Sequence, residues 1–174
     1  AASADNSKTD LASAIQGNVM QRQDADYETW RQSMMWHLSK PERKPDMIVQ
    51  AKSEQDVVEA VNYARRNKLK IAVRSSGHNS TGCVLRDGGM LLDLSFLRDV
   101  KVDPLMKTAS VQPALWNAQL IGEAGLHGLA FPAAHCGSVA IGGYALGGGM
   151  GWNHAHWNGP ACHSIRSMEV ITDQ

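Results

Sequence analysis

The stretch from His135 to Trp152 holds seven glycines in eighteen residues, whereas the whole chain of 174 residues holds sixteen. Each glycine lowers the stability of a regular element and permits a positive φ, so this density predicts neither a helix nor an ordinary strand. Val, Ile, Leu, Met and Trp lie between the glycines, which is not the composition of a flexible linker. The stretch therefore predicts a backbone that closely approaches another body, typically a phosphate group or a flat cofactor.

Composition excludes several classes of function. Lys plus Arg and Asp plus Glu each number 17, and no basic stripe carries interleaved aromatic residues, so no nucleic-acid partner is expected. No apolar run reaches the length of a membrane-spanning helix. The cysteines are an odd number at irregular spacing and leave at least one thiol for other chemistry. They are Cys83, which we expect in the core, Cys136 and Cys162.

The two ends of the chain also suggest expectations. The first residues read Ala-Ala-Ser-Ala-Asp, without methionine and without the charged and apolar regions of a signal peptide. Small residues of this kind remain after cleavage of an export signal, although a shortened chain would begin in the same way. We therefore expect an exported protein, periplasmic or secreted. The abrupt end at Gln174, after an apolar segment, predicts an incomplete part of a larger protein.

Helical and strand patterns are mingled along the chain, which predicts an α+β or mixed α/β fold without a long repeat. The clearest helix follows Ser53, an N-cap candidate with Asp56 three residues later. Trp30 and Trp36 are interpreted as packing residues of an earlier helix. Helices are expected at residues 11–20, 27–38, 53–67 and 114–124, and strands at residues 47–51, 70–74, 90–93, 100–102, 108–111 and 167–172.

Two features that are distant in the sequence could carry chemistry. In Arg74-Ser-Ser-Gly-His-Asn-Ser80, the end of a predicted strand leads into a loop whose N–H groups and hydroxyls could bind a diphosphate. Cys136 stands at the head of the glycine-rich stretch. Either residue type alone has a commoner explanation, because a loop histidine usually makes ordinary hydrogen bonds and a lone cysteine is usually buried and inert.

Together these segments resemble the FAD-linked oxidases of the vanillyl-alcohol oxidase type (the PCMH-type FAD-binding superfamily), in their berberine-bridge-enzyme-like branch. Arg74-Ser-Ser-Gly-His78 is similar to the Arg-Ser-Gly-Gly-His loop of that branch. Cys136-Gly-Ser-Val-Ala-Ile-Gly-Gly143 is similar to its Cys-Pro-Thr-Val-Gly-Val-Gly-Gly segment, and Gly147-Gly-Gly-Met-Gly151 to the Gly-Gly-Gly-x-Gly that follows. The likeness runs in order over residues 24–172.

The resemblance implies an α+β fold, a PCMH-type FAD-binding domain of mixed sheets flanked by helices. It assigns residues 24–174 to this domain and residues 1–23 to an N-terminal extension. In the family, a separate substrate domain covers the flavin and usually supplies the catalytic base, often a tyrosine. That domain is absent from these 174 residues, so we expect it on a missing C-terminal part or on a second chain.

The resemblance also implies FAD as the cofactor, bonded through its 8α carbon to His78 and through its C6 to Cys136. A neutral imidazole and a thiolate are suitable nucleophiles for such bonds. Two bonds would raise the reduction potential and favour hydride acceptance from an alcohol, hemiacetal or amine carbon of a small-molecule substrate. Carried over by position, the other FAD-binding residues are Arg74, Ser75, Ser76, Gly77, Asn79, Ser80, Gly137, Val139, Ala140, Gly142, Gly143, Gly147, Gly148 and Gly149.

Some positions depart from the family pattern. Ala140 stands where the branch frequently has a glycine that faces the ring, and Tyr144 replaces the usual histidine. The methyl group of Ala140 could narrow oxygen access, which predicts a dehydrogenase rather than an oxidase. No catalytic residue is identified in this chain, and Tyr144 and His156 are the residues that could contribute to a substrate pocket.

Two alternatives stay open. His154-Ala-His156 and Cys162-His163 place four potential metal ligands within ten residues. A partly exposed polar loop at the mouth of the active site explains them more simply, so we expect no metal. The chain could also be a non-catalytic flavin- or nucleotide-binding module, which would bind its ligand without turnover.

Overall fold

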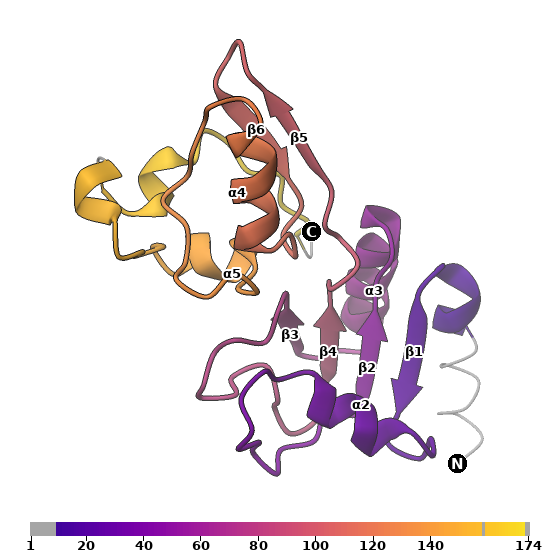
Figure 1. The fold of residues 1–174 in the computed structure, drawn as a ribbon. Helices are drawn as coiled ribbons and strands as arrows, with labels where there is room; N and C mark the ends of the chain where they lie inside the picture. Colours follow the sequence, from indigo (N-terminus) through magenta and orange to yellow (C-terminus); the bar gives the residue numbers. More distant parts are fainter. Residues whose placement is uncertain (1–9, 158, 173–174) are drawn as a thin grey trace. The chain divides into compact units, whose positions relative to one another are not determined.

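The computed structural model of the chain describes residues 10–157 and 159–172, which fall into two compact units (Figure 1). The first unit extends to Phe96 and includes the residues from Val170 onward, and the second is Leu97–Glu169. Each unit has a hydrophobic core and a sheet of its own. Among the described residues, none of the helices has the length and apolar character needed to cross a membrane.

A four-stranded sheet in the order β1-β2-β4-β3 forms the centre of the first unit (Figure 1). Strands β2 (Met47–Gln50), β4 (Met90–Asp93) and β3 (Ile71–Arg74) are parallel, and β1 (Asn18–Gln21) pairs with β2 in the antiparallel sense. The apolar residues of β2 and β4 are buried, as expected for parallel strands that are covered on both faces. Each of the three parallel strands ends in a polar residue.

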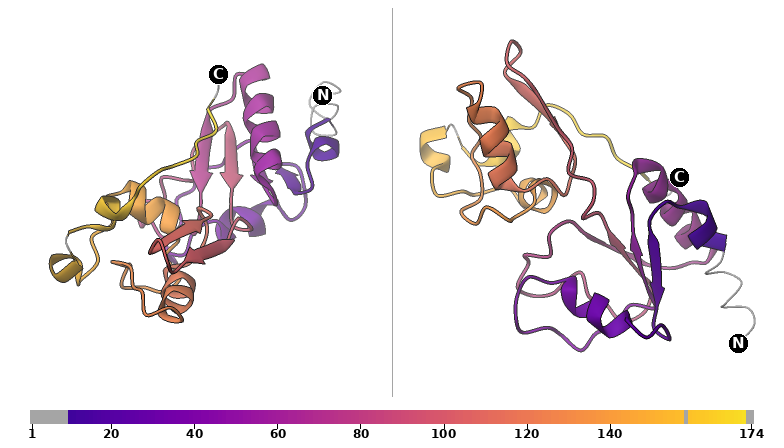
Figure 2. Two further views of the ribbon diagram at one scale, coloured as in Figure 1. Left: turned by 90° about the horizontal axis from the view of Figure 1, so that it is seen from above. Right: turned by 45° about the vertical axis from the view of Figure 1, so that its right-hand side comes forward.

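Helix α3 (Glu54–Arg66) connects β2 to β3 and lies over one face of the sheet (Figures 1 and 2). Ser53 caps the helix as predicted, because its Oγ accepts the N–H of Asp56 at 3.1 Å. The buried Asp56 carboxylate in turn accepts the N–H groups of Gln16 at 3.1 Å and Lys52 at 2.9 Å. The start of α3 is therefore joined to the segment before β1 and to the turn after β2.

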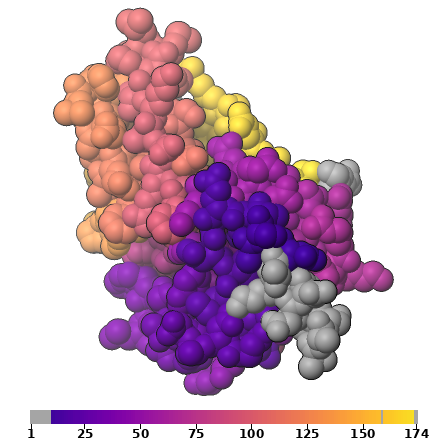
Figure 3. Space-filling model, turned by 90° about the vertical axis from the view of Figure 1, so that its right-hand side faces the viewer, coloured from indigo at the N-terminus to yellow at the C-terminus, as the bar shows by residue number. Residues whose placement is uncertain are grey.

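The other face of the sheet packs against α2 (Tyr27–Ser33) and the loops beside it. Met20 and Trp30 are partly buried against this core. In the space-filling view, the indigo N-terminal residues lie against the purple segments of the same unit (Figure 3). The buried members of the core are Tyr27, Met34, Met35, Ile48, Val84, Leu85 and Leu91.

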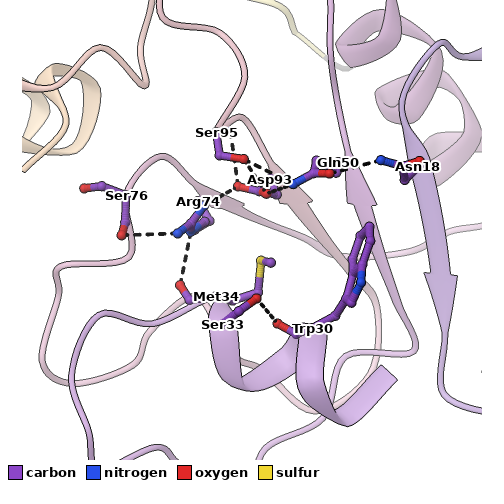
Figure 4. A network of polar contacts seen from close by, with 9 residues as sticks. All are labelled: Asn18, Trp30, Ser33, Met34, Gln50, Arg74, Ser76, Asp93 and Ser95. Atoms are coloured by element: carbon purple, nitrogen blue, oxygen red, sulfur yellow. Dashed lines mark hydrogen bonds and ion pairs between the residues drawn. The ribbon is translucent and has the colours of Figure 1, made fainter. Parts of the chain in front are cut away.

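A row of polar side chains runs along the carboxyl edge of the parallel strands (Figure 4). Asn18, Gln50, Asp93 and Arg74 are register neighbours, one from each strand. Asn18 Nδ2 donates to Gln50 Oε1 at 3.1 Å, and Gln50 Nε2 donates to Asp93 Oδ2 at 3.0 Å. Arg74 Nη1 binds Asp93 Oδ1 at 2.7 Å, and the Ser95 hydroxyl donates to Asp93 Oδ2 at 2.8 Å. The fully buried Asp93 carboxylate is thus well satisfied.

The second unit contains a hairpin of β5 (Val100–Asp103) and β6 (Thr108–Val111), with helix α4 (Asn117–Gly125) in contact with β5. Helix α5 (Ile141–Leu146) follows, and two 3₁₀ turns, η1 (His154–Trp157) and η2 (Ala161–Ser164), come after it (Figure 2). The core of this unit is formed by Leu115, Leu120, Ile141 and Ala145, with Val100, Val111, Phe131 and Ile165 packed against it.

The predicted strands at residues 47–51, 70–74, 90–93, 100–102 and 108–111 and the predicted helices at 53–67 and 114–124 are confirmed, with small shifts at their ends. The predictions of helices at residues 11–20 and 27–38 are partly wrong. Residues 10–14 are helical, but Asn18–Gln21 forms β1, because Gly17 lies so close to β2 that a Cβ would be 1.9 Å from Gln50 O. Helix α2 ends at Ser33, where Arg74 Nε binds the next carbonyl, that of Met34, at 3.1 Å.

Two further expectations are wrong. Residues 167–172 form no strand within the described part of the chain, since the segment pairs with no other strand and Met168 and Val170 are 54% and 72% exposed. The glycine-rich stretch, predicted to contain no helix, includes α5. Burial of Ile141 and Ala145 in the second core offsets the low helix propensity of the two glycines between them.

Replacing Arg74 with methionine is expected to lower the free energy of unfolding by about 3–5 kcal/mol, because Asp93 would stay buried without its cation. Urea denaturation measures this loss. The control Arg22→Met breaks an ion pair with Asp46 whose side chains are 44% and 53% exposed, and it should cost much less. Equal losses in the two variants would contradict the importance of the buried pair.

Candidate flavin site

The loop that carries His78 directly follows β3, and Arg74 orders its first residues. Besides Asp93, the guanidinium binds the carbonyl of Met34 through Nε at 3.1 Å and the carbonyl of Ser76 through Nη2 at 3.4 Å (Figure 4). The Arg74 side chain is 14% exposed. These contacts give Arg74 a role inside the protein, and direct contact with FAD stays a prediction.

Gly77 is required by the geometry of this loop. Its φ is +72°, and a Cβ would lie 2.1 Å from the carbonyl oxygen of Met34. The Gly77 carbonyl accepts the N–H of Trp36 at 3.1 Å. The residue before His78 is therefore fixed against the chain segment that follows α2.

The imidazole of His78 stacks on the indole of Trp36. The ring centroids are 4.9 Å apart and the planes differ by 17°. His78 is partly exposed, and Trp36 is 61% exposed, so the interpretation of Trp36 as a packing residue is wrong. Sequence reasoning missed this contact, because no local pattern distinguishes an exposed tryptophan from a buried one.

The remaining predicted residues of the loop differ in their surroundings. Asn79 Oδ1 accepts the N–H of Thr81 at 2.9 Å and the Thr81 hydroxyl at 2.6 Å, which makes a local turn after His78. Ser75 and Ser76 are partly exposed, and Ser80 is exposed. Their hydroxyls suit the binding of a diphosphate, which stays a prediction.

Asn117, the first residue of α4, fixes the turn that carries Cys136. This fully buried residue donates from its backbone N–H and from Nδ2 to the carbonyl of Val139, at 2.9 Å and 2.7 Å. Its Oδ1 accepts the N–H of Ala134 at 3.0 Å. Asn117 thus holds the chain on both sides of Cys136. Sequence reasoning missed it, because it comes close to the turn only through the fold.

The Cys136 thiol is partly exposed and lies 3.3 Å from the Ser138 hydroxyl. The Ser138 side chain, assisted by the backbone N–H groups of Ser138 and Val139, lowers the pKa of the Cys136 thiol below its ordinary value. A lower pKa increases the fraction of thiolate, which is the nucleophilic form. Cys83, expected in the core, is instead exposed.

The predicted FAD-binding glycines of the second unit are of two kinds. Gly142 is needed for packing, because its N–H donates to Pro113 O at 2.9 Å and a Cβ would lie 2.8 Å from that oxygen. At Gly143 and Gly148 a Cβ would meet no atom within 4 Å. The backbone is therefore accessible at Gly143 and Gly148, as a backbone contact with a cofactor would require.

The remaining predicted residues of this segment differ in how closely they pack within the second unit. Ala140 is 1% exposed and forms a β-bridge with Trp116, so its methyl group packs within the unit. Its proposed effect on oxygen access stays a prediction. A Cβ at Gly137 would lie 3.0 Å from Ala118 Cβ. Val139 is partly exposed and Gly147 is exposed.

Tyr144 stabilises the second half of the glycine-rich stretch. Its hydroxyl donates to the carbonyl of Pro132 at 2.8 Å, and burial raises the pKa of Tyr144. Gly149 and Gly151 lie beside this ring, but the closest contacts of a Cβ would be Ala161 Cβ at 2.5 Å and Ala133 O at 2.2 Å. A substrate-pocket role for Tyr144 stays a prediction, as it does for the exposed His156.

A hollow of about 260 Å³ lies beside the Cys136 turn. The ring of His135 stacks on Trp152, with centroids 4.6 Å apart. This volume is slightly below the range of about 300–1,000 Å³ typical of small-molecule pockets. The walls are mostly apolar and include Ile121, Phe131, Pro132, His135, Trp152 and Trp157.

The metal alternative gains no support. Within residues 10–157 and 159–172, no group of three or more His, Cys, Asp or Glu side chains could hold a metal ion. His154 Nδ1 lies 2.7 Å from the Gly151 carbonyl oxygen. The cluster of His154, His156, Cys162 and His163 therefore does not converge on a common centre in this structure.

The two predicted attachment residues belong to different units, His78 to the first and Cys136 to the second. Ser75 to Ser80 form one continuous loop after β3, and Gly137 to Gly149 form one continuous segment. The structure therefore defines two parts of the candidate site, each with its own local geometry.

Comparison with known proteins identifies the family. A family model described as "FAD binding domain" matches residues 45–174. The FAD-linked oxidoreductase janO of Penicillium janthinellum is 32% identical over 148 residues, which are 85% of this chain and 32% of that protein. The (R)-6-hydroxynicotine oxidase of Paenarthrobacter nicotinovorans is 32% identical over 162 residues, which are 91% of this chain and 34% of the oxidase.

Solved structures agree with this match. The 6-hydroxy-D-nicotine oxidase from Arthrobacter nicotinovorans has a TM-score of 0.69 and 33% identity, over 80% of this chain and 30% of its own. BBE-like 1 of Physcomitrella patens has a TM-score of 0.72 and 26% identity, over 84% of this chain and 32% of its own. The glucose dehydrogenase Phl p 4 has the same four values.

The chain belongs to the family of FAD-binding domains of PCMH type, within the berberine-bridge-enzyme-like branch of the vanillyl-alcohol oxidase superfamily. The predicted fold class is confirmed. The chain spans about a third of the length of the curated relatives that it matches.

Replacing Ser138 with alanine is expected to raise the pKa of the Cys136 thiol, because the largest contribution to its lowering is lost. In the flavin-free protein, the midpoint of the pH dependence of Cys136 alkylation by iodoacetamide should move to higher pH, since the thiolate reacts. Mass analysis of the Cys136 peptide measures the rate, with the exposed Cys83 as an internal reference. A midpoint that is the same in both proteins would contradict the role of Ser138.

Proposed function

We propose that this chain is the FAD-binding part of a flavin-dependent oxidoreductase, with FAD bonded to both His78 and Cys136. Membership of the family supports FAD as the cofactor. The surroundings of Cys136 support the covalent bond most directly. Its thiol is partly exposed, its pKa is lowered by Ser138, and Asn117 fixes the turn on both sides of it.

The residues of the first unit also suit FAD. His78 follows the carboxyl end of a parallel strand, where open α/β sheets commonly bind ligands. Ser75 and Ser76 are partly exposed residues with hydroxyl groups, and Ser80 is an exposed one. These donors could bind a diphosphate, and the ordered backbone at Gly77 would keep them in place.

FAD, when bound, supplies the acceptor for the hydride that leaves the substrate. This chain contributes binding, orientation and two nucleophilic atoms, a ring nitrogen of His78 and the Cys136 sulfur. Ser138 and the turn N–H groups lower the pKa of the thiol, which increases the fraction of the nucleophilic thiolate. Attachment at two points would leave the ring little freedom to move during turnover.

In this proposal the substrate is a small molecule with a hydride-donating carbon that bears a hydroxyl, hemiacetal or amine group. The names of two related proteins, a 6-hydroxynicotine oxidase and a glucose dehydrogenase, support this range. The catalytic base and most of the substrate pocket would belong to a C-terminal substrate domain or to a second chain.

Covalent attachment is tested by precipitating the protein in acid, digesting it and identifying the flavin-bearing peptides by mass. The wild-type flavin should stay with peptides that contain His78 and Cys136. His78→Ala should leave attachment at Cys136 alone, Cys136→Ala at His78 alone, and the double variant should release all FAD. The control Cys83→Ala replaces an exposed thiol and should keep both bonds. Dissociation of all wild-type FAD in acid would contradict the covalent proposal.

The reaction with oxygen is tested separately. If the Ala140 methyl narrows oxygen access, the reduced wild-type flavin should be reoxidised slowly by air, and Ala140→Gly should speed this reaction. Stopped-flow absorbance measures both rates. Solved structures of Phl p 4 are described as a glucose dehydrogenase and, for a variant, as a glucose oxidase, so one fold accommodates either behaviour. Rapid reoxidation of the wild type would overturn the dehydrogenase prediction.

A further inference from the structure

We propose that Trp36 is a positioning residue that holds the imidazole plane of His78 during covalent attachment of FAD. This inference rests on the proposed function, since it concerns the His78 bond. The two rings are stacked, with centroids 4.9 Å apart and planes that differ by 17°. Contact with a large flat neighbour restricts both side-chain torsions of a histidine.

The exposure of Trp36 indicates a role other than packing. The side chain is 61% exposed, whereas Trp30 of the preceding helix is packed against the core. A large aromatic ring left mostly in water stabilises the fold little, because little of its apolar surface is removed from solvent. Its ring stacks on His78.

The backbone fixes the two stacked residues relative to each other. Trp36 N–H donates to the carbonyl of Gly77 at 3.1 Å, directly before His78. Two residues before Trp36, the Met34 carbonyl accepts a hydrogen bond from Arg74 Nε at 3.1 Å. Gly77 lies so close to the same carbonyl that a Cβ on Gly77 would not fit. The stack therefore joins two segments that are already held together, which makes it a stable support for the ring.

The stack is also compatible with bond formation. Stacking covers a face of the imidazole, whereas the lone pair of a neutral ring nitrogen lies in the ring plane, so Trp36 does not obstruct the direction of attack. Attachment forms an N–C bond to the 8α carbon and breaks one C–H bond there. The methyl hydrogen and the imidazole hydrogen leave as protons, and two electrons remain on the flavin until dioxygen, the external oxidant, removes them.

The test compares variants of Trp36 in the purified protein, reconstituted with saturating FAD in air. Trp36→Leu keeps an apolar side chain but removes the ring, and it should slow attachment at His78 by about 2- to 10-fold, the range expected for loss of an aromatic pair. Trp36→Phe keeps a ring and should restore most of the rate. The control Leu38→Ala removes a 94% exposed apolar side chain two residues away and should have no effect. Peptide mass over time gives the rate at His78.

A second measurement does not depend on flavin. In the flavin-free protein, diethyl pyrocarbonate should modify His78 faster in Trp36→Leu than in the wild type, because an imidazole that is no longer stacked is more mobile and more exposed to the reagent. The exposed His127 of the other unit serves as the internal reference. Thermal unfolding should be nearly the same in all variants, which separates positioning from a general loss of structure.

Each outcome decides a different point. Unchanged attachment and unchanged modification of His78 in Trp36→Leu would overturn the positioning role. Faster modification with unchanged attachment would mean that the stack exists but does not assist bond formation, which also overturns it. A wild-type protein that never bonds FAD at His78 would overturn the proposed function and the inference with it, and the modification rates would still report whether the stack forms.

Discussion

The buried ion pair between Arg74 and Asp93 organises the part of the molecule that leads to His78. Asp93 ends the central strand β4 and is fully buried, so it requires a cation and further donors. Arg74 ends the neighbouring strand and extends from the pair to the carbonyls of Met34 and Ser76. One guanidinium therefore connects the sheet, the end of α2 and the start of the His78 loop.

In the second unit, the turn that carries Cys136 is held by hydrogen bonds between neutral groups. The amide and backbone of the buried Asn117 bind the chain at Ala134 and Val139, and Cys136 lies between these two points. The flanking hydrogen bonds fix the turn without occupying the thiol. The hydroxyl of Ser138 then adjusts the pKa of the thiol. Both proposed attachment residues are thus partly exposed side chains on backbone that is held by buried polar contacts.

Features that depend on residues close together in the sequence could be predicted, and features that depend on contacts between distant segments could not. Helix α3 was predictable because Ser53 and Asp56 lie three residues apart and form a local cap. The α5 helix was not, since it depends on burial of Ile141 in a core assembled from distant segments. The motifs around His78 and Cys136 were recognisable, yet Trp36 and Asn117 were missed, because they come to these residues only through tertiary contacts.

The most direct measurement is the intact mass of the protein under denaturing conditions. The account predicts one species, heavier than the polypeptide by one FAD less the hydrogens lost at both bonds. Reduction and alkylation before the measurement should leave the Cys136 sulfur unmodified, since it would already carry the flavin. A mass equal to that of the bare polypeptide would contradict the central claim that His78 and Cys136 are bonded to FAD.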